Sequence, residues 1–241
     1  MTLPSAQKLY AVIDGTWPAS AKQAVGPWIV RLDNSGSSRV AAATAELPIT
    51  PNDIEPAANA MLEAGQRPLF MIREGDESLD QMLEQRGYRI KDPVNMYAVP
   101  VAELAQKRPP PVTTFEVWPP LAIQHEIWSA GGIGAGRLAI MDRARPPKVS
   151  ILGRVEDTPA GSAYVGKAGD CAMIHGLEVA VDFRRQGLAA NLMRAAAFWA
   201  QDQGVTFLTL VTTQDNVAAN ALYTSLGMTN VGQYHYRVLM E

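Results

Sequence analysis

The order of apolar and polar residues predicts a mixed α/β fold, most clearly in the second half of the chain. Apolar residues on both faces of Cys171–Val181 and Thr206–Thr212 predict two buried strands. Between them, Leu188–Gln203 has apolar residues at helical spacing and ends before a glycine, which predicts a helix. Asn216–Leu226 predicts a second helix and Tyr234–Met240 a closing strand. Together these elements form a strand–helix–strand–helix–strand core.

Shorter elements precede this core. The pattern predicts strands over Phe115–Trp118, Lys148–Glu156 and Ser162–Lys167, helices over Leu121–Ala130 and Arg137–Arg143, and a turn at Thr158–Gly161. The two helices are joined by the glycine-rich segment Gly131–Gly136, whose composition resembles a nucleotide-binding loop. Because this segment follows a helix and not a strand, we interpret it as a connector, with a substrate loop as the alternative.

A run of three prolines near the middle of the chain divides it into two blocks. With 241 residues, the chain is longer than one domain of about 150 residues and shorter than two. Pro109–Pro111 lack amide donors and have fixed φ angles, so neither a helix nor a central strand can continue through them. We therefore predict two domains, residues 1–108 and 112–241; a surface loop within one domain is the alternative.

The two blocks share a weak internal similarity. At a constant offset of 140 residues, the aligned pairs are Phe70–Ile72 with Leu210–Thr212, Asp76 with Asn216, and Gly87 with Gly227. Near the start, Ala11–Trp17 aligns with Ala122–Trp128 at an offset of 111. The similarity predicts an internal duplication into paired domains, because repeats of short period are absent from the sequence. Two unrelated blocks are the alternative.

A short basic turn between the strand Leu177–Val179 and the helix that starts at Leu188 is the segment most informative about chemistry. In this turn Arg184 and Arg185 lie close to Gly187. Free N–H groups at a helix N-terminus and the helix dipole favour an anion, and a glycine allows a phosphate to approach closely. The turn therefore predicts a diphosphate site, although it matches neither the P-loop nor the three-glycine dinucleotide pattern.

Two motifs in the second block resemble those of the GCN5-related N-acetyltransferase (GNAT) superfamily. The first, Arg184-x-x-Gly187-x-Ala189, resembles its pyrophosphate-binding motif. The second resembles a motif that usually ends in Gly-Phe, and here it is Asn216-x-x-Ala219-x-x-Leu222-Tyr223-x-x-x-Gly227-Met228. The resemblance covers about residues 115–241. It implies an α/β fold of two GNAT-like domains, each with a mixed, mostly antiparallel sheet flanked by helices.

The resemblance also implies acetyl-CoA as co-substrate and assigns residues to it. Free backbone groups of Val179, Ala180 and Val181 would pair with the pantetheine arm. The residues that would wrap the diphosphate are Arg184, Arg185, Gln186, Gly187, Leu188 and Ala189. Asn216 would contact the pantetheine or hold the loop, and Tyr223 would protonate the leaving thiolate as general acid.

The general base is open between two side chains and water. Strand alternation places His175, Leu177 and Val179 on one face and Glu178 on the other. In arylalkylamine N-acetyltransferases, a histidine four residues before the position that resembles Val179 faces the acceptor amine, and His175 has that position. An imidazole can accept an ammonium proton near neutral pH. We therefore expect His175 to be the base, with Glu178 as the alternative.

The first block lacks this chemistry at the aligned positions. Leu83 aligns with Tyr223 and cannot donate a proton, and Thr44–Ile49 aligns with the basic turn but has neither arginine nor glycine. We therefore expect a degenerate GNAT-like domain that shapes one wall of the acceptor cleft.

Composition narrows the classes of partner and location. The formal net charge of −3 provides no basic field for nucleic acid, and no apolar run is long enough to span a membrane. The single cysteine, Cys171, excludes an internal disulfide and a cysteine-rich zinc site, and no metal site is expected. Because the N-terminus does not resemble a signal peptide, we expect a cytoplasmic protein. The oligomeric state is open, a homodimer included.

The predicted function is acetyl-CoA-dependent N-acetyl transfer. A primary amine of a small molecule or peptide would attack the thioester directly in a ternary complex. The alternative is a CoA-binding sensor or interaction module without turnover, which would need the basic turn but neither Tyr223 nor a base.

Overall fold

Helices and strands are interspersed along residues 2–239, the part of the chain that the computed structural model describes. The first half consists of α1 (Ala6–Thr16), β1 (Ala21–Val25), β2 (Trp28–Leu32), α2 (Ser38–Ala41), β3 (Ala43–Ala45), α3 (Ile54–Glu63), β4 (Leu69–Ile72), α4 (Glu77–Gln85), β5 (Tyr88–Pro100) and α5 (Val101–Leu104). The second half consists of β6 (Thr114–Val117), α6 (Ala122–Ala130), α7 (Ala135–Arg143), β7 (Lys148–Val155), β8 (Thr158–Ala168), β9 (Cys171–Val179), α8 (Leu188–Asp202), β10 (Phe207–Thr213), α9 (Val217–Ser225) and β11 (Thr229–Leu239).

All the strands belong to one mixed sheet, which confirms the predicted α/β class. Their order is β1-β2-β3-β4-β11-β5-β10-β9-β8-β7-β6. The pairs β3–β4 and β9–β10 are parallel, and the other neighbouring pairs are antiparallel. The two halves thus join their strands into one sheet.

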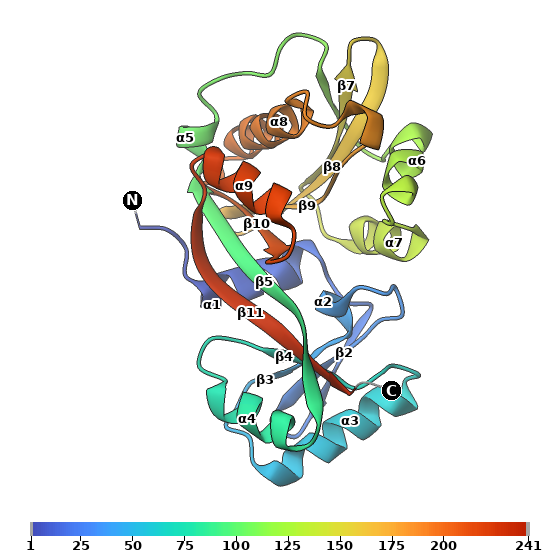
Figure 1. Ribbon diagram of the computed structural model, residues 1–241, viewed down its shortest axis with the longest axis vertical. Helices are drawn as coiled ribbons and strands as arrows, with labels where there is room; N and C mark the ends of the chain where they lie inside the picture. Colours follow the sequence, from blue (N-terminus) through green and yellow to red (C-terminus); the bar gives the residue numbers. More distant parts are fainter. Residues whose placement is uncertain (1, 240–241) are drawn as a thin grey trace.

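The last strand of each half lies within the other half's part of the sheet. β5 pairs with β10, β11 pairs with β4, and the two long strands pair with each other along the molecule (Figure 1). The register repeats at the offset seen in the sequence, because Tyr97 pairs with Leu210 and Arg237 pairs with Phe70. Each half therefore depends on a strand from the other to complete its sheet.

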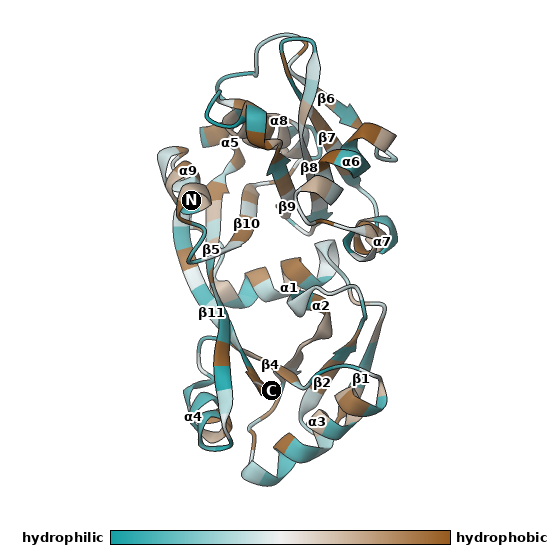
Figure 2. Cartoon of the chain, turned by 45° about the vertical axis from the view of Figure 1, so that its right-hand side comes forward, coloured by the Kyte–Doolittle hydropathy of each residue, from teal (hydrophilic) through white to brown (hydrophobic). Residues whose placement is uncertain are grey.

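Helices cover both faces of this sheet. On one face, α1 crosses the middle of the molecule between the two halves (Figures 1 and 2), and its apolar residues share a core with β4, β5, β9, β10 and β11. α6 and α7 cover the same face of the second half around Trp128 and Tyr164. On the opposite face, α8 and α9 cover the second half and α3 and α4 the first.

Several predicted boundaries were wrong, with the largest differences in the strands. The hairpin between β7 and β8 turns at Glu156, whose φ is 50°, and not at Thr158–Gly161. Gly161 lies inside β8, where a Cβ would come within 3.0 Å of Leu188 Cδ2, so this glycine allows α8 to pack closely. β9 ends at Val179, two residues before its predicted end at Val181. β11 begins at Thr229, and its predicted end, Met240, lies outside the described residues.

An ion pair attaches the exchanged strand β11 to the first half. Arg237, whose side chain is 4% exposed, donates to both carboxylate oxygens of Asp80 in α4, at 2.7 and 2.9 Å. His235 Nε2 lies 2.8 Å from the same carboxylate. Hydrogen bonding from Arg237 lowers the pKa of Asp80 below its usual value.

Replacing this carboxylate is expected to destabilise the protein. Because Asp80→Asn leaves a buried guanidinium with only the more distant Glu84 carboxylate, at 3.5 Å, the free energy of unfolding should fall by about 2 kcal/mol, less than for a fully buried pair since Asp80 is partly exposed. Because the pKa of Asp80 is lower in the folded state, the stabilisation by its carboxylate is present above about pH 4 and is lost as the pH falls further. Urea unfolding between pH 7 and pH 3 measures both effects.

Asp157→Asn is the matched control, because Asp157 pairs with Arg154 in full exposure to solvent. It should leave unfolding unchanged. Equal effects of the two substitutions, or a gap between wild type and Asp80→Asn that persists at pH 3, would contradict the assignment.

Candidate active site

The central parallel strands of the second half separate at their carboxyl ends. β9 and β10 pair from Cys171 with Phe207 as far as Ile174 with Leu210. β9 then continues to Val179 and β10 to Thr213 without pairing to each other. The facing edges of these last residues therefore keep unpaired backbone groups, to which an extended ligand can bind as a strand does.

Backbone direction decides which predicted pantetheine contacts are available. The N–H of Ala180 donates to the carbonyl of Ala160 at 2.8 Å, so this N–H is not among the free backbone groups predicted for residues 179–181. In an antiparallel pair the adjacent residue directs its backbone groups the other way, which turns the N–H of Val179 toward the open edge. Val181 lies in the short 3₁₀ turn Val181–Phe183, with its side chain 71% exposed.

The turn before α8 presents a series of free N–H groups. Arg185 and Gly187 have φ angles of 65° and 83°, and backbone in such alternating conformations forms an anion-binding concavity. No acceptor among residues 2–239 bonds the N–H of Arg185, Gln186 or Gly187. The first helical bond of α8 is from Asn191 N–H to the carbonyl of Gly187, at 3.1 Å, so the three N–H groups before it are also free. This arrangement fits a diphosphate.

Some side chains around this turn fix its conformation, and others are available to a ligand. Arg184 points away from the predicted diphosphate position: its Nε donates to the carbonyl of Val179 at 3.0 Å, and its Nη2 to Glu178 at 3.1 Å. Leu188 is buried in the core below, and Ala189 packs partly against it. Arg185 makes no ion pair within the described part of the chain, which leaves its charge for a ligand. Arg184 therefore locks the turn, and the free charge beside the N–H groups is that of Arg185.

Tyr223 of α9 lies on the α8 side of the sheet with its ring buried. Its centroid is 5.8 Å from that of Tyr97, which comes from the exchanged strand β5. Burial, with a smaller effect of Tyr97, raises the pKa of Tyr223 to about 12. Its hydroxyl makes no hydrogen bond to any residue from 2 to 239. The phenol therefore stays protonated at physiological pH and keeps its proton for a ligand.

Asn216 and Asn220 hold the loop between β10 and α9. Asn216 caps α9, and its side chain accepts from the N–H of Ala219 at 3.2 Å. Asn220 donates to the carbonyls of Thr213 and Asn216, and its Oδ1 accepts from the Tyr97 hydroxyl at 2.9 Å. Sequence reasoning missed Tyr97 and Asn220. Tyr97 belongs to the first half, so the motif gave no signal for it; an asparagine inside a helix was the only signal for Asn220.

A β-bulge in β9 overturns the predicted separation of the two candidate bases. Ser162 pairs with Glu178, but Tyr164 pairs with His175, so β9 has one residue more than β8 between these pairs. Gly176 lies at this bulge, and its φ of 57° is typical of a glycine-containing bulge. His175 and Glu178 therefore share a face, contrary to simple alternation, and this face is the one covered by α1, α6 and α7.

His175 is packed between the two halves. Its exposure is 3%, its ring stacks on Trp17 with centroids 4.8 Å apart, and burial, helped by the charge of Arg39, lowers its pKa well below the usual value. Nδ1 lies 2.8 Å from Arg39 Nη1, which can only donate, so Nε2 carries the proton and donates to Thr16 Oγ1 at 2.8 Å. Both ring nitrogens are therefore engaged, and this geometry disfavours His175 as the base.

Glu178 is the better-placed candidate. Its side chain is 18% exposed and packs against Gly131 in the loop between α6 and α7, where a Cβ would lie 2.5 Å from Glu178 Cδ. The glycine-rich segment thus acts as a connector that leaves room for this carboxylate. Arg184 holds one carboxylate oxygen and leaves the other open.

Comparison with known proteins agrees with this geometry. Residues 110–228 match the family model of the acetyltransferase (GNAT) family. The chain is a member of the GNAT superfamily of N-acetyltransferases. It is 21% identical to an uncharacterized N-acetyltransferase of Bacillus subtilis (strain 168), YobR, over 96% of this chain and 98% of that protein.

Solved GNAT structures share the fold along most of the chain. A GCN5-related N-acetyltransferase from Kribbella flavida superposes with a TM-score of 0.75 at 20% identity, covering 98% of this chain and 96% of that one. A tandem GNAT protein from the clavulanic acid biosynthesis pathway superposes with a TM-score of 0.58 at 13% identity, covering 81% and 74%. Within residues 2–239, no helix is long and apolar enough to cross a membrane.

In the first half, side chains fill the space beside the aligned strands. β3 and β4 are parallel and pair only at Ala43 and Phe70. The side chain of Arg73 donates to the carbonyl of Ala45 and to Glu46 across the space between them. The 3₁₀ turn Pro51–Asp53, which leads into α3, is capped by its own side chains, since the Asp53 carboxylate accepts from the N–H of Thr50 at 2.7 Å. Side chains of the chain itself thus use these backbone groups.

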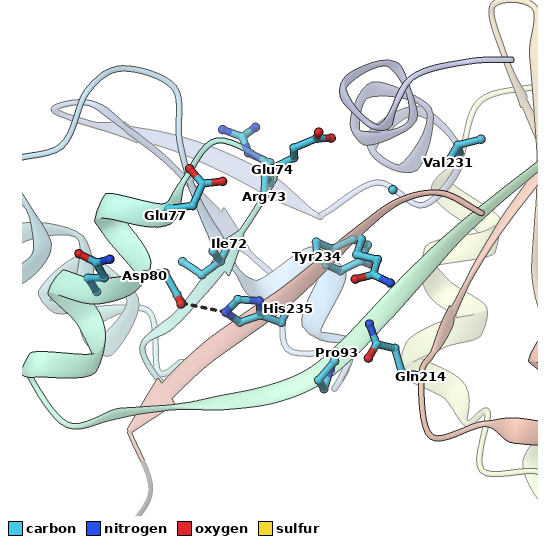
Figure 3. Close-up of a pocket in the computed structure, with 13 residues that line it drawn as sticks. Ile72, Arg73, Glu74, Glu77, Asp80, Pro93, Gln214, Val231, Tyr234 and His235 are labelled. Carbon is cyan, nitrogen blue, oxygen red and sulfur yellow. Dashed lines mark hydrogen bonds and ion pairs between the residues drawn. The ribbon is translucent and has the colours of Figure 1, made fainter. Parts of the chain in front are cut away.

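A cavity of about 640 Å³ lies beside α4, away from the β9–β10 edge, and His235 and Asp80 bond across one of its walls (Figure 3). A smaller cavity, of about 210 Å³, is lined by Val211, Thr212 and Thr213 of β10. This smaller cavity is closer to the candidate active site, because those three residues belong to the part of β10 that has separated from β9.

Proposed function

We propose that the protein transfers the acetyl group of acetyl-CoA to a primary amine by direct attack in a ternary complex. The observation that carries the proposal is the coincidence of two features. The strands β9 and β10 stop pairing after Leu210, and the free N–H groups before α8 follow the end of β9. One feature suits the pantetheine arm and the other the diphosphate.

The chain's own residues provide the remaining roles. When bound, acetyl-CoA supplies the activated acyl group. The backbone N–H of Val179 donates to the reacting carbonyl, and the Tyr223 hydroxyl donates its proton to the departing sulfur. Glu178 accepts the proton of the attacking amine, either directly or through water. Arg184 orients Glu178 and the turn together.

In this proposal the two halves form a tandem pair with one working site. The first half, residues 1–108, is a degenerate GNAT-like domain in which Leu83 replaces the tyrosine and Arg73 closes the strand edge. It contributes Tyr97 and α1 to the second domain, residues 112–241. The cytoplasm remains the location that we expect.

A binding measurement followed by an assay tests this function. Acetyl-CoA at about 100 times its dissociation constant should raise the melting temperature by roughly 5–10 °C. A panel of amines should then release CoA thiol, measured with a thiol-reactive dye. No thermal shift with acetyl-CoA or CoA would refute the cofactor assignment. A shift without thiol release from any amine would support the CoA-binding sensor instead.

A further inference from the structure

The 210 Å³ cavity beside β10 is lined by residues from both halves of the chain. Val211–Thr213 form one wall, Arg39 of α2 and Arg137 of α7 face it from the two halves, and Tyr234 and Tyr236 of β11 close it. It lies on the α1 face of the sheet, the face that carries Glu178 and His175. Pantetheine lying in the β9–β10 edge would reach this cavity from the α8 face.

Positive charge in the cavity is only partly compensated by the protein. Lys91 is paired with Asp92, but neither Arg39 nor Arg137 has a carboxylate partner within residues 2–239. Burial and the nearby charge of Arg137 lower the pKa of Arg39. Two guanidinium groups that repel each other in a partly buried cavity gain stability from an anion placed between them.

Arg39 is held in position for such a ligand. Its Nη1 donates to His175 Nδ1 at 2.8 Å, and its guanidinium lies 4.8 Å from the centre of the Trp17 ring. These contacts leave its Nε and Nη2 groups without acceptors among the described residues. His175 is therefore a positioning residue for Arg39.

Tyr236 also lines the cavity. Its side chain is 2% exposed, and its hydroxyl lies beside that of Tyr234 without an acceptor at normal hydrogen-bond geometry within the described chain. A buried donor without a good partner is costly unless a ligand accepts its hydrogen bond. The lining residues provide three cationic side chains, Arg39, Lys91 and Arg137, against one carboxylate, Asp92, so positive charge in the cavity exceeds negative charge.

We infer that this cavity binds the acceptor amine through an anionic group of the substrate, a carboxylate or a phosphate, held by Arg39, Arg137 and Tyr236. The amine at the other end of the substrate would then point along β10 toward the separated strands. The volume suits a molecule the size of an amino acid. The inference rests on the proposed acetyl transfer, and it names the substrate class for that site.

Matched amines test the inference. β-Alanine is compared with β-alaninamide, and O-phosphoethanolamine with ethanolamine, so each pair differs in the anionic group. Calorimetric titration of the CoA-saturated protein measures binding without turnover, and released thiol gives KM and kcat. We expect at least one anionic amine to bind roughly 10-fold or more tightly than its neutral partner. The carboxylate and phosphate pairs show which anion is preferred.

Arg137→Gln should abolish this preference, while Arg145→Gln, an exposed arginine outside the cavity, should keep it. Arg137→Lys should restore part of it. Equal binding of both members in both pairs, or equal preferences in Arg137→Gln and wild type, would overturn the inference. Failure of CoA itself to bind would instead refute the proposed function, so the two failures are distinguishable.

Discussion

Tyr223→Phe is expected to lower kcat about 100-fold while leaving the dissociation constant of acetyl-CoA within a factor of two or so. The substitution removes only the hydroxyl, and the ring keeps its packing against Tyr97 at 5.8 Å. Because burial raises the pKa of Tyr223 to about 12, the phenol is protonated throughout the range in which the enzyme can be assayed. The loss in kcat should therefore be the same at pH 6 and pH 9.

Tyr88→Phe is the matched control for this prediction. Tyr88 is also buried and also has a raised pKa, but it lies in the core of the first half. The control should have wild-type kcat. If Tyr223→Phe turned over at the wild-type rate across the pH range, or if the loss in kcat appeared in both variants, the general-acid role would be refuted.

Gly187→Val is expected to weaken acetyl-CoA binding by about 100-fold, through the loss of charge-assisted hydrogen bonds from the turn to the diphosphate. With a φ of 83°, Gly187 adopts a conformation that a β-branched residue avoids. Relaxation of the backbone would turn the N–H groups of Gly187, Leu188 and Ala189 away from a common point. Calorimetric titration with acetyl-CoA measures the effect.

Gly65→Val separates this effect from a general loss of stability. Gly65 has a φ of 71°, and a Cβ added there, as at Gly187, would meet no atom within 4 Å. Both variants should therefore unfold at a lower temperature by a similar amount, but only Gly187→Val should lose affinity. Equal affinities of the two variants for acetyl-CoA would refute the diphosphate assignment.

Local features of the site were predictable because they depend on short stretches of chain. The turn from β9 into α8 needs a glycine with positive φ and free N–H groups, and both follow from Arg184–Ala189 as a strand-to-helix connection. The cap of α9 by Asn216 is equally local. The duplication signal at an offset of 140 also anticipated a register that the paired strands repeat, from Tyr97–Leu210 to Arg237–Phe70.

Features that depend on neighbouring strands were not predictable in the same way. Alternation placed His175 and Glu178 on opposite faces, but the extra residue at Gly176 brings them to the same one. The glycine was a visible signal for a bulge, yet only pairing with β8 shows where the register shifts. The hydrogen bonds that engage both ring nitrogens of His175 come from Thr16 and Arg39, more than 130 residues away.

The sequence by itself determined the superfamily and the mixed α/β class, and it located the strand-to-helix turn and the tyrosine to which we assign the diphosphate and the acid role, since each is encoded by residue types at short, regular spacing. Only the tertiary structure decided that the halves exchange their last strands, and that exchange brings Tyr97 to Tyr223 and Tyr236 to the arginine-lined cavity. The physical reason is that strand pairing and burial are long-range: backbone hydrogen bonds pair any two compatible edges, and residue spacing does not specify which edges meet.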